Sequence, residues 1–224
     1  IEESGDFENL ISSNDTIAFC YPIYGSCVPM IMREFVAKHK SNLNGKKIII
    51  FCTQVKFSGD GARIFTDLLE GISYTVIYAE HINMPNNISN FFLMPIASDE
   101  KARKNIINAE KKMNGVCEDI KKGIVKRRGF NVFSKYIGLL CQRLYFRSFE
   151  KKAKKSVKIN SDCIVCEKCI RNCPMNNLKL VDKKVEQNGN CTLCYRCVNL
   201  CPEKAITVLF SSKVGKQYNL DVGD

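Results

Sequence analysis

Short apolar runs alternate with amphipathic segments through the first half of the chain. Residues 16–20 (TIAFC) and 48–52 (IIIFC) are continuously apolar, and residues 74–79 (YTVIYA) form a third run. Such runs are typical of parallel strands that are covered on both faces. Helices are predicted over residues 29–40, which open with a proline, and over residues 60–70. Strands that alternate with helices predict a doubly wound α/β sheet.

A longer helix is predicted to begin at Ser98, whose hydroxyl suits an N-cap. Asp99 and Glu100 follow in the first turn, where the helix dipole favours acidic side chains. Apolar residues then recur at helical spacing, at Ala102, Ile106, Ala109, Met113, Val116 and Ile120. This helix completes a first domain over residues 1–122.

Cysteines concentrate in the last third of the chain. Residues 163–174 and 191–202 each read C-x2-C-x2-C-x3-C-P, and they hold eight of the thirteen cysteines. Three thiolates two residues apart let a tight loop hold three corners of a cubane, while the fourth cysteine, before proline, reaches a neighbouring cluster. Two zinc sites or disulfides are the alternatives, but zinc ribbons need only two C-x2-C pairs.

The duplication extends beyond the cysteines, because a shift of 28 residues also aligns residues 177–180 with residues 205–208. Residues 159–210 resemble bacterial two-cluster ferredoxins, an α+β fold in which the clusters replace most of a small apolar core. The resemblance implies low-potential, one-electron transfer. The interleaved ligand sets are Cys163, Cys166, Cys169 and Cys201 for one [4Fe–4S] cluster, and Cys191, Cys194, Cys197 and Cys173 for the other.

Two polar loops follow the first two predicted strands, at residues 21–27 (YPIYGSC) and 53–61 (TQVKFSGDG). Ligands of doubly wound sheets bind beyond the carboxyl ends of the strands. Aromatic, hydroxyl and glycine residues suit a flat heterocycle there, although ordinary turns have a similar composition. Together with Met-Pro-Asn at residues 84–86, these loops resemble those of ferredoxins that carry a flavodoxin-like N-terminal domain.

This second resemblance spans essentially the whole chain and implies an FMN cofactor. It places Tyr24 and Gly25 on one side of the isoalloxazine ring, and Thr53, Gln54, Phe57, Ser58 and Gly59 on the other. Flavodoxin-like domains open with a strand and a phosphate-binding loop at a helix N-terminus. The sequence begins at Ile1 with neither, and enters directly what would be the third strand.

In the flavodoxin-like strand order, residues 16–20 belong in the interior of the sheet, and a bare edge strand is an aggregation hazard. We therefore expect a flavodoxin-like domain that is truncated at its N-terminus. The expected organisation is a flavodoxin-like domain at 1–122, a basic helical linker at 123–158, a two-[4Fe–4S] ferredoxin domain at 159–210 and a tail at 211–224.

Positive charge concentrates in residues 120–158, which contain thirteen Lys and Arg residues and one acidic residue, Glu150. Within them, apolar residues at roughly helical spacing are Tyr136, Ile137, Leu140, Leu144, Tyr145 and Phe149. One interpretation is a connecting helix whose apolar stripe packs on the domains it joins. Another is docking of an acidic redox partner. An anionic membrane surface and a nucleic acid remain further alternatives, but no nucleic-acid-binding fold accompanies the patch.

The composition fits a cytoplasmic protein of an anaerobe or microaerophile, without a signal peptide or an apolar run of membrane-spanning length. Outside the repeats, Cys20, Cys27, Cys52, Cys117 and Cys141 are predicted to be buried apolar residues. His39 is predicted to be solvated and His81 to be structural. No nucleophile and base set is recognisable.

These features favour an electron carrier or relay that exchanges electrons with a redox partner protein. A flavin-dependent oxidoreductase that acts on a small molecule is the alternative, with the clusters feeding electrons to FMN. A nucleic-acid-binding protein with structural clusters is a third hypothesis.

Overall fold

The computed structural model describes residues 5–91, 94–212 and 214–219, and packing divides the chain into two compact units. The first unit takes residues 1–84 and 105–147, and the second takes residues 85–104 and 148–224. The division falls within α3 (Asp99–Lys121) and within α5 (Leu144–Ala153). The units therefore differ from the expected domains, because residues 85–104 pack with the cysteine repeats and residues 123–147 pack with the sheet.

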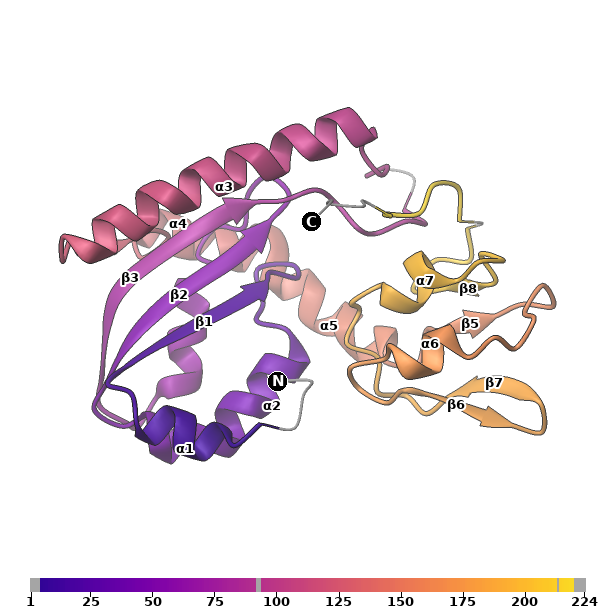
Figure 1. Cartoon of the computed structure of the whole chain (residues 1–224), viewed down its shortest axis with the longest axis horizontal. Helices are drawn as coiled ribbons and strands as arrows, with labels where there is room; N and C mark the ends of the chain where they lie inside the picture. Colours follow the sequence, from indigo (N-terminus) through magenta and orange to yellow (C-terminus); the bar gives the residue numbers. More distant parts are fainter. Residues whose placement is uncertain (1–4, 92–93, 213, 220–224) are drawn as a thin grey trace. The chain divides into compact units, whose positions relative to one another are not determined.

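A parallel sheet in the order β1-β2-β3-β4 forms the centre of the first unit (Figure 1). The three apolar runs lie in β1 (Thr16–Pro22), β2 (Lys46–Gln54) and β3 (Tyr74–Asn83). β1 and β3 each pair in parallel with β2. The predicted α/β class is thereby confirmed, and the described sheet is compatible with a flavodoxin-like fold.

β4 (Lys126–Arg127) pairs in parallel with β3, within the segment that was expected to be a helical linker. Both residues are exposed and basic, so they carry no strand pattern. The strand forms because the backbone meets the edge of β3, where the Arg127 side chain also donates a hydrogen bond to the Val76 carbonyl (2.8 Å).

β1 lies at the edge of the described sheet, and it is covered on one face rather than on both faces as its apolar run predicts. Phe19 and Tyr21 are buried, whereas Ala18 and Cys20 on the opposite face are exposed. This alternation is typical of a strand covered on one face. The prediction that all five cysteines outside the repeats are buried is correct for Cys27 and Cys52. It is wrong for Cys20, Cys117 and Cys141, which are exposed.

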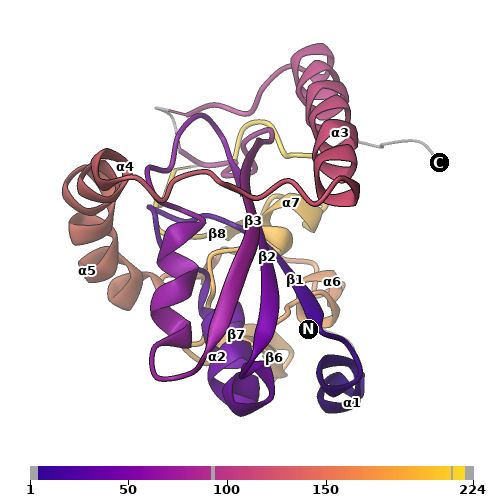
Figure 2. The ribbon, with the colours of Figure 1, turned by 90° about the vertical axis from the view of Figure 1, so that its left-hand side faces the viewer.

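The larger apolar core lies on one face of the sheet, against α2 (Met30–His39) and η2 (Arg63–Leu69), with α1 (Phe7–Ser12) and η1 (Lys40–Leu43) beside them. Helix α3 covers the other face, where Val116 packs against Ile49 and Tyr78 (Figure 2). The helix predicted over residues 60–70 is present as η2, which has 3-10 geometry over Arg63–Leu69.

His39 is buried rather than solvated, because it ends α2 against the ring of Phe35 at a centroid distance of 4.8 Å. The neighbouring Lys38 and Lys40 suggested that His39 lies at the surface. Packing of its ring against Phe35 at the end of α2 buries it instead.

The second unit holds two short antiparallel ladders. β5 (Lys158–Ile159) pairs with β8 (Ile206–Thr207), and β6 (Leu178–Val181) pairs with β7 (Lys184–Gln187). The cysteine loops lead into α6 (Lys168–Arg171) and α7 (Arg196–Leu200). Each repeat therefore contains a cysteine loop, a short helix and a strand, as the 28-residue duplication predicts.

His81 near the end of β3 gives the first unit a titratable group that must stay neutral. Its side chain is buried, and Nε2 accepts a hydrogen bond from the Ala62 backbone N–H (3.2 Å). Burial, followed by the nearby Arg128 cation, lowers the pKa of His81 from its ordinary 6.5 to about 4. Between these two pKa values the unfolded chain binds a proton that the folded chain does not, so stability falls as pH falls.

We predict that between pH 7 and pH 5 the titration of His81 removes about 2 kcal/mol from the free energy of unfolding. His81→Gln keeps an acceptor for the Ala62 N–H and removes the titration. Urea unfolding at both pH values should therefore show a smaller acid loss in the variant than in the parent protein. Equal losses in the two proteins would show that His81 does not set this pH dependence.

Candidate metal centre

Left-handed residues bend both cysteine loops at equivalent positions. Val165 (φ 54°) and Glu167 (φ 58°) separate the first three cysteines of one loop, and Leu193 (φ 62°) and Tyr195 (φ 60°) do so in the other. Non-glycine residues adopt this region only where the surrounding structure requires it. The chain thus turns sharply between successive cysteines, which a loop that surrounds a compact cluster must do.

One set of thiols lines a single pocket in the second unit. The pocket wall contains Cys163, Cys166, Cys169 and Cys201, together with Ile164, Glu167, Lys168, Val185, Pro202, Glu203 and Ile206. Burial, and then the Cys163 and Cys201 thiolates, raise the pKa of the Cys169 thiol to about 11. Cys201 of the second repeat therefore lies with the first loop.

The other set gathers around the second loop. Burial and the neighbouring Cys194 and Cys173 thiolates raise the pKa of the Cys191 thiol to about 11. The pKa of Cys197 is raised well above its ordinary value by burial and by Cys194, Cys191 and Cys173. Cys173 of the first repeat therefore lies with the second loop, and this placement supports the interleaved ligand sets.

The donor chemistry fits iron–sulfur clusters. All eight donors are thiols, and crowded thiolates in a buried place repel one another unless a cationic centre neutralises them. Soft thiolate donors select iron–sulfur clusters or zinc. Over the described ranges, no three or more His, Cys, Asp or Glu side chains are arranged to hold a single metal ion.

Backbone N–H groups support three of the sulfurs. The N–H of Asn177 donates to Cys173 Sγ (3.2 Å), and the equivalent N–H of Ala205 donates to Cys201 Sγ (3.3 Å). Leu193 donates in the same way to Cys191 Sγ (3.4 Å). Hydrogen bonds to cluster sulfurs are one of the factors that set reduction potential.

The two loops differ in what covers them. Asn87, which lies 107 residues before Cys194 in the sequence, donates through its side chain to the Cys194 carbonyl (3.2 Å). Its own carbonyl accepts from the Asn199 side chain (2.9 Å), and Asn199 also bonds the Ser89 hydroxyl. Asn199 is buried. Residues 85–91 therefore bind over the second loop.

The first loop has no such cover among the contacts described. The equivalent Cys166 carbonyl accepts from the exposed side chain of Arg171 (3.2 Å), which occupies the repeat position of Asn199. Ile164 is 62% exposed. The sequence comparison of the repeats did not single out Asn87 and Asn199, although the Arg-to-Asn difference between the repeats was a signal that the two loops have different surroundings.

The residues predicted to bind flavin lie together at the carboxyl ends of β1 and β2. The Ser58 hydroxyl donates to Gln54 Oε1 (2.6 Å), and the Tyr24 N–H donates to the Cys27 carbonyl (3.1 Å). Ser58 and Gln54 are buried, whereas Phe57 is 52% exposed. Thr53 accepts a backbone hydrogen bond from Ile23 (2.9 Å), so the two loops also contact each other.

Residues 134–146 occupy the place predicted for the flavin ring. Gly25 (φ 52°) lies directly against the Phe146 ring, and a Cβ at Gly59 (φ 60°) would lie 2.6 Å from Gly138 Cα. The two glycines allow this close approach because a side chain at either position would collide with the segment. No room remains between these loops and the segment for an isoalloxazine ring, so the residues present do not fit FMN in this arrangement.

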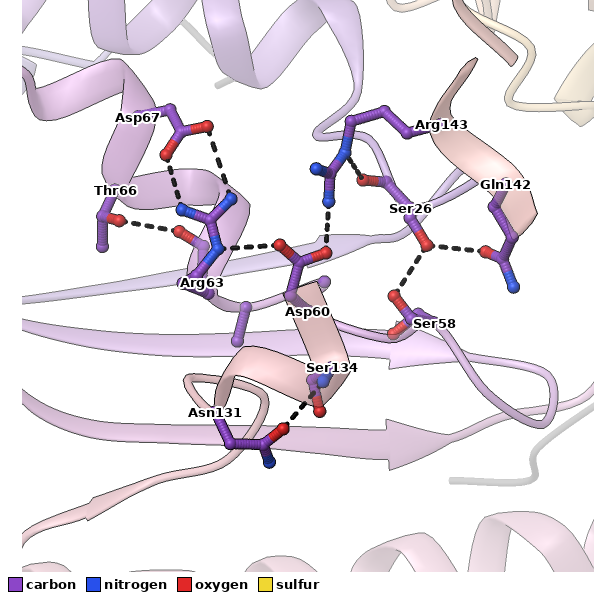
Figure 3. Close-up of polar contacts among 12 residues, drawn as sticks. Ser26, Ser58, Asp60, Arg63, Thr66, Asp67, Asn131, Ser134, Gln142 and Arg143 are labelled. Atoms are coloured by element: carbon purple, nitrogen blue, oxygen red, sulfur yellow. Dashed lines mark hydrogen bonds and ion pairs between the residues drawn. The ribbon is translucent and has the colours of Figure 1, made fainter. Parts of the chain in front are cut away.

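A buried ion pair attaches this segment to the sheet (Figure 3). Asp60 is fully buried and pairs with Arg143, which is also buried, and with Arg63 (2.7 Å). Arg143 Nε donates to the Ser26 carbonyl (3.2 Å). The Ser26 side chain also bonds Gln142 Oε1 (2.7 Å), next to Arg143. The contacts of Gln142 and Arg143 join residues that lie more than eighty positions apart.

Comparison with known proteins supports the cysteine assignment. Residues 162–205 match the family model of the 4Fe-4S dicluster domain, and this range spans both cysteine runs. The cysteine repeats thus form an iron–sulfur domain of ferredoxin type, which supports metal binding and electron transport. Neither the curated proteins nor the solved structures contain a match to the chain. In the described part of the chain, no helix combines the length and apolar character needed to cross a bilayer.

We predict about eight irons and eight sulfides per chain after anaerobic reconstitution, from the ligand count of two cubanes. Interleaving is tested with two double variants. Cys163→Ala with Cys201→Ala should remove one cluster and leave about four irons, whereas Cys163→Ala with Cys173→Ala should damage both clusters. Iron analysis and electron paramagnetic resonance of the reduced protein measure the outcome. The reverse pattern would contradict interleaving, and protein that loads zinc and resists iron would contradict the clusters.

We also predict that Arg143→Met lowers the free energy of unfolding by about 3 kcal/mol, because it leaves the buried Asp60 carboxylate with one cation fewer. The double variant Arg143→Met with Asp60→Asn is the matched control. It removes the uncompensated charge and should recover part of the loss. Urea denaturation of both variants measures the effect, and a loss below about 1 kcal/mol in the single variant would show that the pair does not hold the segment.

Proposed function

We propose that the chain is an electron carrier with two [4Fe–4S] clusters, built on a flavodoxin-like sheet that acts without flavin. The gathering of eight thiols in two interleaved sets, inside the range that matches the dicluster domain, carries the proposal. Bound [4Fe–4S] clusters supply one-electron transfer. A reducing cytoplasm is the compartment in which the thiols remain available for cluster assembly.

The chain's own residues provide unequal surroundings for the two clusters. Asn87 and Asn199 hold residues 85–91 over the Cys194 loop. The pocket of the other set opens beside the exposed side chains of Ile164 and Glu203. Exposure and hydrogen bonding both tune cluster potential, so the two sites differ in potential and in access.

An acidic redox protein is the proposed partner. Lys151, Lys152 and Lys155 are exposed, and the Lys154 carbonyl accepts a hydrogen bond from the Cys191 N–H (3.3 Å). This lysine cluster is therefore directly adjacent to a cluster-binding loop in the same unit. Complementary charge accelerates transient encounters of this kind.

A flavin-dependent oxidoreductase is the weaker hypothesis, because no observation favours it. Phe146 and Gly138 fill the space at Gly25 and Gly59 where a flavin ring would stack.

We predict that changing Lys151, Lys152, Lys154 and Lys155 to Glu slows electron transfer to an acidic flavodoxin by about tenfold or more at low salt. The difference should shrink as salt rises, because screening weakens attraction between exposed charges. Stopped-flow mixing of the reduced protein with the oxidised flavodoxin measures the rate.

The matched control changes four exposed lysines by the same charge, namely Lys101, Lys104 and Lys111 of α3 and Lys122 directly after it. The control should have a smaller effect, with iron content unchanged in both variants. Equal slowing by both sets would show a general charge effect. If the fully loaded parent protein transfers no electrons, the carrier function itself is refuted.

A further inference from the structure

Residues 132–145 turn their apolar side chains outward. The exposed fractions are 70% for Val132, 74% for Phe133, 58% for Tyr136, 56% for Leu140, 54% for Leu144 and 75% for Tyr145. We call these six residues the outer stripe. A helix on a protein surface normally buries its apolar side against the core. The interpretation of an apolar stripe that packs on the joined domains is therefore wrong for these residues.

The side of this segment that faces the sheet makes polar contacts, beside the Phe146 ring that lies against Gly25. Gly138 lies against the Asp60 carboxylate, Arg143 pairs with Asp60, and Gln142 bonds Ser26 (Figure 3). Rotating the segment to bury the outer stripe would leave the Asp60 carboxylate buried with one partner fewer, which is costly. The outward orientation of the apolar side chains is therefore built into the fold.

A π-helical turn keeps the outer stripe on one side. The segment runs from α4 (Val132–Ile137) through the π-helical η3 (Gly138–Arg143) into α5. Val132, Tyr136, Leu140 and Leu144 are spaced four residues apart, and in an α-helix each such step overshoots a full turn by about 40°. The wider π turn absorbs part of this overshoot. The stripe thus continues along about 20 Å of helix without winding around it.

Basic residues flank the outer stripe on both sides in sequence. Lys126, Arg127 and Arg128 precede it, Lys151 and Lys152 follow it, and Lys135 lies within it. Lys135 and the following pair are exposed. Glu150 is the one acidic residue between positions 120 and 158. Any surface that binds here must accept a long apolar row and several positive charges together.

We propose that the outer stripe binds the surface of an anionic lipid bilayer, with the helix lying in the plane of the interface. Leucine, phenylalanine and tyrosine side chains enter the boundary between headgroups and acyl chains, while the exposed Lys135, Lys151 and Lys152 side chains contact anionic headgroups. Lys126 and Arg128 pair with Glu80 and Arg127 bonds the Val76 carbonyl, so these three side chains are not part of the proposed contact. A row of four side chains with Phe133 and Tyr145 beside it suits a planar interface, whereas a helix bound in a protein groove presents a few anchors at i, i+3, i+4 and i+7. The electron carrier would then work at a membrane surface.

Flotation of the reconstituted full chain with vesicles tests this proposal. The protein should float with phosphatidylcholine vesicles that contain phosphatidylglycerol, and should float much less with phosphatidylcholine alone. Leu140→Gln with Leu144→Gln should weaken partitioning by about tenfold or more, because two apolar side chains no longer enter the interface. The matched control is Leu10→Gln with Ile107→Gln, two apolar residues that are 56% and 62% exposed elsewhere in the first unit. The control should bind as the parent protein does.

A second measurement reports insertion directly. The chain contains no tryptophan, so Tyr145→Trp creates a single fluorophore in the outer stripe. Its emission should shift to shorter wavelength with the anionic vesicles, and circular dichroism and iron content should match the parent protein.

Three outcomes would overturn the proposal. The parent protein could stay in the soluble fraction with the anionic vesicles, or the leucine variant could bind as tightly as the control. Sedimentation without lipid could instead show that the parent self-associates and the leucine variant does not, which would make the stripe an interface between copies. Iron content and electron transfer to flavodoxin in solution are independent of all three, so the carrier function is judged separately.

Discussion

Crowding of thiolates in a small unit is the physical constraint on which the second half of the molecule depends. Its two ladders contain strands of only two to four residues, so secondary structure contributes little to its stability. Eight sulfur donors take the place that an apolar core has in larger domains. Thiolates at such density are stable only around cationic centres, and metal binding and folding are therefore coupled in this unit.

The first unit differs from the second, because an apolar core packs on its sheet. Apolar side chains of the parallel sheet pack against helices on its two faces. The polar loops at the carboxyl ends of the strands lie outside these apolar cores. In many α/β proteins those loops hold a ligand. Here residues 134–146 occupy the same position, and Asp60 and Arg143 form a buried pair where a cofactor would provide contacts.

The attachment of residues 134–146 to the sheet also determines what their opposite side exposes. Because the polar face is bound to the sheet, the apolar face must turn outward, and the hydrophobic cost of this exposure has to be offset elsewhere. The proposed membrane binding of this apolar face, together with the cluster domain, suggests an electron carrier that works at a bilayer surface rather than free in solution. Within the second unit, residues 85–91 bind the second cysteine loop, so this unit includes a segment that lies far from the repeats in sequence.

The cluster ligands and the strands could be predicted from the sequence alone because both depend on local patterns. Cysteine spacing determines which loop can surround a cubane, and a continuous apolar run such as residues 48–52 suits a covered strand whatever its neighbours are. The fourth cysteine of each run, directly before proline, predicts that Cys173 and Cys201 exchange between the loops, and this stays a prediction.

Contacts between distant residues decided the rest. β4 exists because Lys126 and Arg127 meet the edge of β3, and their own side chains carry no signal for it. Helical periodicity identified an apolar stripe at residues 136–145, but the pairing of Arg143 with Asp60 determines which side of the helix faces the protein. The cover over the Cys194 loop likewise depends on Asn87, more than a hundred residues away. Sequence periodicity shows which residues share one side of a helix. Only tertiary contacts determine whether that side packs against the protein or faces outward.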